Sequence, residues 1–136
     1  MPVVGLSINS IDAKKLAEVT FGVKVNSNTN LTNVKEQDLP GFAKKGIMID
    51  FDFLTQYIAP KDKKVAEFII KGNVLVVDDN HKKIVDSWKK DKKLPDDIGI
   101  QVVNVIFNRC AKKSIILSDD LQLPSPVPLP FAKKNK

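Results

Sequence analysis

Hydrophobic and polar residues alternate over positions 47–53, where large apolar residues occupy every odd position and Asp50 and Asp52 occupy two of the three even ones. A period of two is typical of a strand with one buried face and one solvated face. The pattern therefore predicts a half-buried strand. Its predicted inward residues are Ile47, Ile49, Phe51 and Phe53.

Residues 65–77 repeat this alternation and are predicted to form the partner strand, with Phe68, Ile70, Val74 and Val76 on one face. Gly72 interrupts the run, which indicates a bulge or a close approach of another backbone. Residues 59–64 then form a hairpin loop. Two further strands are predicted, at 6–16 and at 23–34. The most economical arrangement of the four is an antiparallel meander.

The second half of the chain is predicted to be helical. Asn80 is a good N-cap for a short helix, and Ile84, Val85 and Trp88 give it a narrow apolar stripe. Residues 94–97 break this helix, and Asp96 or Asp97 would cap a long one over 98–121. The apolar residues of the long helix cover more than one face. We therefore expect it to pack on the sheet and also against the tail or a second subunit, which makes a homo-oligomer possible.

Prolines occupy every second position from 124 to 130, so the chain leaves the long helix as a stiff extended segment. We predict an α+β domain over residues 1–122, with a four-stranded antiparallel sheet, a short helix and a long one. A proline-rich basic tail follows over residues 123–136. Such a tail is either a binding element or a clamp on the domain.

The 136-residue chain carries a net charge of +6, and its lysines recur in pairs. Paired lysines suit the phosphates of RNA, but they are equally typical of the solvated surface of a lysine-rich protein. Trp88 lies among lysines and could stack on a base, although packing on the sheet explains it better. The candidate RNA-binding residues are Lys44, Lys45, Lys82, Lys83, Lys89, Lys90, Lys92, Lys93, Lys112, Lys113, Lys133, Lys134 and Lys136.

The sequence contains little catalytic equipment. His81 is the single histidine and is best explained as a surface residue at a helix start. Cys110 is the single cysteine and is best explained as a buried thiol, and one histidine with one cysteine cannot form a zinc site. Asp50 and Asp52 could hold a divalent ion, but the solvated face of an alternating strand explains them better. We expect no enzyme, no catalytic residues, no metal and no cofactor. With no apolar run of about 18 residues and no signal-peptide pattern, we expect a cytoplasmic protein that does not interact with a membrane.

The order of elements, the segment NVIFNRC at 104–110 and the exit LQLPSPVPLPF at 121–131 resemble the SecB protein-export chaperone. The resemblance implies a non-enzymatic dimer of dimers that binds unfolded polypeptide along apolar grooves. The residues that would line these grooves are Ile49, Phe51, Phe53, Phe107, Leu123 and Leu129.

Two functional hypotheses follow. In the first, a basic, archaeal-type relative of SecB is a ribosomal protein that contacts ribosomal RNA and neighbouring ribosomal proteins. In the second, the protein is a cytoplasmic SecB-like chaperone that holds unfolded polypeptides for export. SecB presents an acidic face to the export motor, whereas this chain is basic and ends in lysines. We therefore place the ribosomal hypothesis first.

Overall fold

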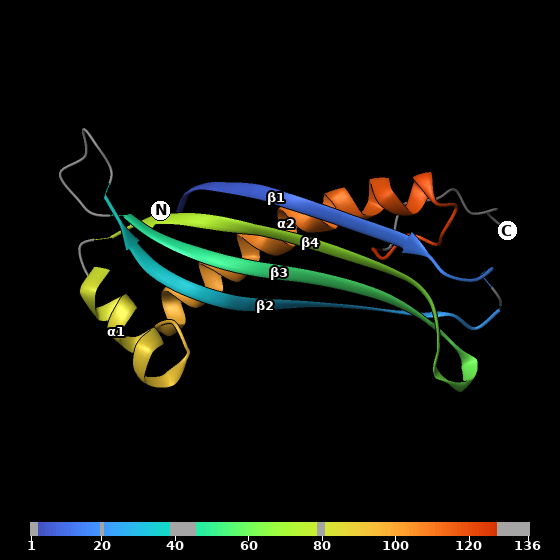
Figure 1. The fold of residues 1–136 in the computed structure, drawn as a ribbon, viewed down its shortest axis with the longest axis horizontal. Coiled ribbons are helices and arrows are strands. Elements are labelled where there is room, and N and C mark those ends of the chain that lie inside the picture. Colours follow the sequence, from blue (N-terminus) through green and yellow to red (C-terminus); the bar gives the residue numbers. More distant parts are fainter. Residues whose placement is uncertain (1–2, 20, 39–45, 79–80, 128–136) are drawn as a thin grey trace, which may run out of the picture.

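The computed structural model describes residues 3–19, 21–38, 46–78 and 81–127. Four strands come first, β1 (Val3–Lys15), β2 (Lys24–Gln37), β3 (Gly46–Ala59) and β4 (Lys63–Val77), followed by the helices α1 (His81–Asp91) and α2 (Asp96–Asp120). A 3₁₀ turn over Pro60–Asp62 joins β3 to β4. The protein is thus an α+β fold with a four-stranded antiparallel sheet, a short helix and a long one, as predicted (Figure 1).

The strand order across the sheet is β1-β4-β3-β2, and all neighbouring strands are antiparallel. Strands β2, β3 and β4 form the predicted meander. The prediction of a full four-stranded meander is wrong, because β1 pairs with β4 and not with β2. The physical reason lies in composition: β3 and β4 bury mostly apolar residues at alternate positions and take the centre, while the more polar β1 and β2 take the edges.

The inward face of β3 agrees with the alternating pattern, since Ile47, Ile49, Phe51 and Phe53 are all buried. Gly72 of β4 is the predicted close approach. A Cβ atom at this position would overlap the backbone oxygen of Ser7 in β1. The register of β1 against β4 shifts just beyond this point.

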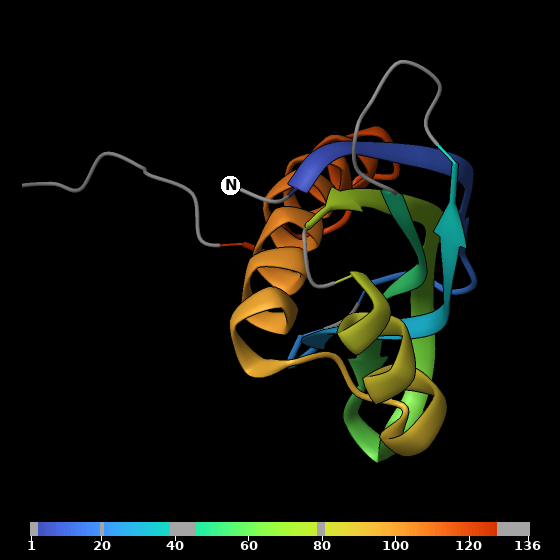
Figure 2. The same ribbon diagram turned by 90° about the vertical axis from the view of Figure 1, so that its left-hand side faces the viewer.

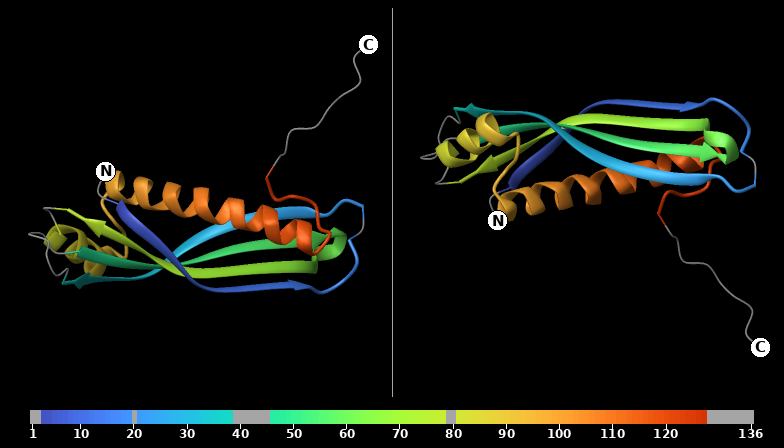
Figure 3. Two further views of the ribbon diagram at one scale, coloured as in Figure 1. Left: turned by 90° about the horizontal axis from the view of Figure 1, so that it is seen from above. Right: turned by 90° about the horizontal axis from the view of Figure 1, so that it is seen from below.

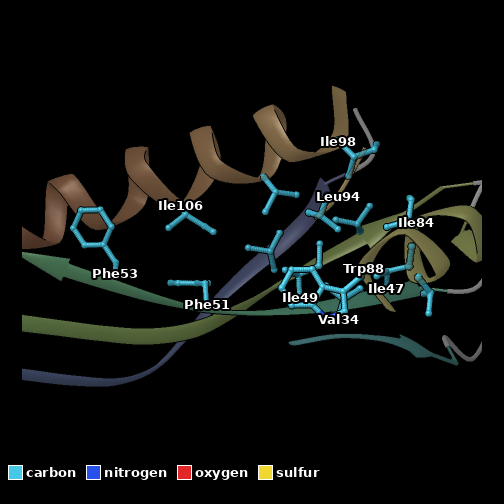
Figure 4. Close-up of a cluster of buried hydrophobic side chains, with 14 of the residues drawn as sticks. Val34, Ile47, Ile49, Phe51, Phe53, Ile84, Trp88, Leu94, Ile98 and Ile106 are labelled. Carbon is cyan, nitrogen blue, oxygen red and sulfur yellow. The ribbon is translucent and has the colours of Figure 1, made fainter. Parts of the chain in front are cut away.

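Both helices cover the same face of the twisted sheet (Figure 2; Figure 3). Helix α1 buries its predicted apolar stripe near one end of the sheet. Helix α2 runs along the sheet and buries every fourth residue, which gives it a narrow contact line. That line consists of Ile98, Val102, Ile106, Cys110, Ser114 and Ser118. Figure 4 shows side chains of α1, α2 and β3 meeting in one cluster.

The start of α2 corrects one prediction. Pro95 occupies the N-cap position and no side chain caps the helix, so neither Asp96 nor Asp97 is the cap. Both aspartates lie in the first turn instead, where the positive end of the helix dipole favours a carboxylate. The predicted cap of α1, Asn80, lies outside the described residues.

The tail begins as a clamp on the domain. Gln122 adopts a left-handed conformation with φ of 56°, and the chain then turns back, so that the backbone N–H of Leu123 donates to the carbonyl oxygen of Ser118 at 2.8 Å. Leu123 is buried against the end of the sheet, in a cluster with Tyr57 and Phe68. The Tyr57 hydroxyl donates to the carbonyl oxygen of Pro124 at 2.5 Å. The division into a domain and a tail at residue 123 stays a prediction.

Candidate functional site

Two hollows lie on either side of the N-terminal half of α2. The first has a volume of about 600 Å³ and lies between α2, the end of α1 and strand β2. The second has a volume of about 730 Å³ and lies between α2 and β1. Asn104 lines both hollows, so it marks the ridge of helix that separates them.

The first hollow is predominantly apolar. Ile100 is 62% exposed, although it is a large aliphatic residue. Trp88 contributes its ring, and the Lys92 ammonium lies 5.7 Å from the ring centroid, within the range of a cation–π contact. Binding of a ligand that covers exposed apolar surface is favourable, because that surface is removed from water. The lining residues are Leu31, Trp88, Lys92, Lys93, Leu94, Asp96, Gly99, Ile100, Val103 and Asn104.

The second hollow combines apolar residues with cations and amides. Val4 of β1 is 54% exposed, and a Cβ atom at Gly5 would meet nothing within 4 Å, so this wall is open. Helix α2 forms the opposite wall and supplies Arg109 and Lys112. The lining residues are Val3, Val4, Gly5, Leu6, Gln101, Asn104, Val105, Asn108, Arg109 and Lys112.

The periodicity of α2 explains why the hollows form where they do. A contact line that repeats every four residues leaves the neighbouring positions on the two flanks of the helix. Ile100 and Val103 fall on the flank toward the first hollow, and Val105 falls on the flank toward the second. The apolar excess of this helix was the available signal for these residues. They were not among the predicted site residues, and neither was Arg109.

The predicted groove residues of the sheet are not part of either hollow. Ile49, Phe51 and Phe53 are at most 1% exposed, because α2 covers their face of the sheet, so the prediction that they line a groove is wrong. Phe107 is 39% exposed and packs edge-on against Phe53, with 5.6 Å between ring centroids.

The tail residues predicted for the grooves also lie apart from the hollows. Leu123 is buried where the tail clamps the domain. Leu129 lies outside the described residues.

The predicted RNA-binding lysines are spread over several places. Lys92 and Lys93 lie at the first hollow and Lys112 at the second. Lys82 and Lys89 line a smaller hollow, of about 300 Å³, together with two acidic residues, Glu36 and Asp86. The remaining described lysines of the set, Lys83, Lys90 and Lys113, lie on α1 and α2. Lys44, Lys45, Lys133, Lys134 and Lys136 lie outside the described residues.

The structure also places the residues that were considered for base stacking, thiol chemistry and metal binding. Trp88 is 7% exposed and packs in the core with Ile84, which confirms the packing interpretation over base stacking. Cys110 is buried, and its thiol has a pKa raised to about 11. Burial causes the rise, and the charge of Arg109 opposes it only in part. In the part of the chain that the structure describes, no three histidine, cysteine or acidic side chains gather as a metal site. None of the helices described is long and apolar enough to cross a bilayer.

The fold matches a solved structure over almost its whole length. That structure is a SecB-like chaperone of Mycobacterium tuberculosis in complex with a ChAD peptide from the HigA1 antitoxin, with a TM-score of 0.62. The chain has a SecB-like fold. The match covers 98% of this chain and 91% of the other, at 9% sequence identity. No protein-family model and no curated protein sequence matches the chain.

Proposed function

We propose that the protein is a chaperone-type binding protein that holds non-native polypeptide in the hollows beside α2. The observation that carries the proposal is the first hollow, where Ile100 and Val103 hold apolar surface open beside the Trp88 ring. Clefts of this size and lining are typical of sites for flexible apolar ligands. The solved SecB-like chaperone of the same fold, which holds a peptide, supports the same interpretation.

The alternative of a ribosomal protein receives less support. It depended on paired lysines and on a basic tail. The described lysines are divided among hollows with different neighbours. Lys82 and Lys89 share a hollow with Glu36 and Asp86, and Lys92 and Lys93 share one with Asp96. The solved structure described above is a SecB-like chaperone in complex with a peptide. We therefore place the chaperone hypothesis first.

The proposal is tested by changing Ile100 alone. Full burial of an aliphatic side chain of this size contributes about 1.5–3 kcal/mol. Because Ile100 is already 38% covered in the free protein (100 − 62), a polypeptide that covers the rest gains about 1–2 kcal/mol. Ile100→Gln should therefore weaken binding about 5- to 30-fold.

The assay is fluorescence anisotropy with a labelled protein kept unfolded by reduction and alkylation of its cysteines. Ile116→Gln is the matched control, because Ile116 is 55% exposed on the same helix and lines neither hollow. Equal affinity of the Ile100→Gln and Ile116→Gln variants would refute the proposal for this hollow. The ribosomal alternative would be supported if both variants sediment with ribosomes from a cell lysate and neither binds the unfolded protein.

A further inference from the structure

The second hollow differs from the first in its charge. Arg109 and Lys112 lie three residues apart on α2, so both side chains reach the same stretch of the helix surface. In the described residues, the lining of this hollow includes no carboxylate, whereas Asp96 lies at the first hollow. A ligand in the second hollow therefore meets two uncompensated positive charges.

The polar groups around these cations are amides that suit a peptide. Asn104 and Asn108 are exposed, and each can donate to a carboxylate or to a peptide carbonyl. The side-chain oxygen of Gln101 is buried and has no hydrogen-bond partner within the described residues. An unpaired buried acceptor is costly, so a rotation of this side chain that brings its oxygen to an incoming N–H group would be favourable.

The opposite wall of the hollow is an edge strand. Among the described strands, β1 has a neighbour on one side only, so one row of its backbone N–H and C=O groups faces outward. Val4 has no partner in the register of β1 with β4, and a Cβ atom at Gly5 would meet no other atom within 4 Å. Peptides that add to a sheet edge do so in an extended conformation.

The dimensions fit a short extended segment. Positions 101 to 112 of α2 span about 17 Å, at about 1.5 Å per residue. An extended polypeptide covers that distance with about five residues, at about 3.3 Å each. Alternate side chains of such a segment would face α2 and its two cations.

We propose that the second hollow selects acidic stretches of extended polypeptide, with Arg109 and Lys112 as the residues that determine this specificity. The inference rests on the proposed function, because it names which polypeptides that function favours. Apolar residues of the segment contact Val4 and Val105, and its carboxylates pair with the cations across the rim.

The test compares three labelled peptides of about nine residues, long enough for the hollow and its ends. The peptides share the same apolar residues and carry glutamate, glutamine or lysine at the alternate positions. At low ionic strength, the glutamate peptide should bind about tenfold more tightly than the glutamine peptide, the effect of two partly exposed charge pairs. The lysine peptide should bind most weakly.

The decisive variant is the double substitution Arg109→Gln/Lys112→Gln. It should bring the glutamate and glutamine peptides to within about threefold of each other, with little change in the affinity for glutamine. Lys71→Gln/Lys90→Gln is the matched control, because it removes the same net charge from two exposed residues outside this hollow. The control should keep the preference for glutamate.

The remaining outcomes each contradict something specific. Tight binding of the glutamine peptide with no preference for glutamate would overturn the acidic specificity and leave the proposed function intact. A preference that the control variant loses as fully as the double variant would mean that net charge alone is responsible, which also overturns the inference. Failure of all three peptides to bind would refute the proposed function as well. Displacement of the glutamate peptide by a single-stranded RNA at lower concentration would assign the hollow to RNA instead.

Discussion

The substitution Gly72→Ala tests the packing of β1 on β4, and with it one wall of the second hollow. The new Cβ atom would overlap the backbone oxygen of Ser7 and lie 3.0 Å from Phe51 Cζ and 3.1 Å from Ile8 Cα. The Phe51 side chain need shift only by a few tenths of an ångström, but the backbone of β1 is fixed by its pairing with β4. The contact can be relieved only if β1 moves away from β4.

Overpacking of this kind usually costs about 1–3 kcal/mol, and we expect the upper end because the obstacle is backbone. Gly72→Ala should therefore lower the free energy of unfolding by about 3 kcal/mol and leave a folded protein, since domains have about 5–15 kcal/mol of stability. The measurement is urea unfolding followed by the fluorescence of Trp88, the single tryptophan.

Gly5→Ala is the matched control on the opposite strand. A Cβ atom at Gly5 would meet nothing within 4 Å, so this variant should unfold at the same urea concentration as the parent or at a slightly higher one. If Gly72→Ala costs less than about 1 kcal/mol, or no more than Gly5→Ala, then the close approach of β1 to β4 is not as described.

Three further results are expected. Burial raises the pKa of Tyr57 to about 12 from the 10.0 of an unfolded chain, so stability should be complete below pH 10 and fall by about 3 kcal/mol as the pH rises to 12. Tyr57→Phe should remove this part of the alkaline loss, which urea unfolding at each pH measures, and an unchanged profile would count against the burial of the hydroxyl. Cys110 should react with a thiol reagent far more slowly in the folded protein than in urea, because its thiol is buried and its pKa is raised to about 11; similar rates would show that the site is open. Phe53→Ala should destabilise the domain by about 3–5 kcal/mol, since the ring is buried under α2, and a small loss of stability with a large loss of client binding would restore Phe53 as a groove residue.

The elements could be predicted because their hydrophobic patterns are strong. The alternation over residues 47–53 fixes which face of β3 is inward, and Gly72 marks a close approach that the structure confirms. The position of β1 could not be predicted in the same way. The sequence of β1 is compatible with pairing at either edge of the sheet. Its place beside β4 packs Val3 and Leu6 against the core cluster that α2 helps to form, and such contacts are distant in sequence.

The candidate site was harder to predict than the fold. A buried residue such as Phe51 and a groove residue such as Ile100 are both simply apolar in the sequence. Only the path of α2 over the sheet decides that Phe51 is covered and that Ile100 is open. The apolar excess of the helix indicated that some of its residues had a partner beyond the sheet, but it did not indicate which.

The most direct test of the central claim is to place a photo-reactive amino acid at position 104, on the ridge between the two hollows, and irradiate the protein with an unfolded polypeptide. Position 116, which is exposed on the same helix and outside both hollows, receives the same residue in a parallel sample. Strong cross-linking from position 104 and weak cross-linking from position 116 is the predicted result. Equal cross-linking from both positions, or stronger cross-linking from position 116, would contradict the assignment of polypeptide binding to these hollows.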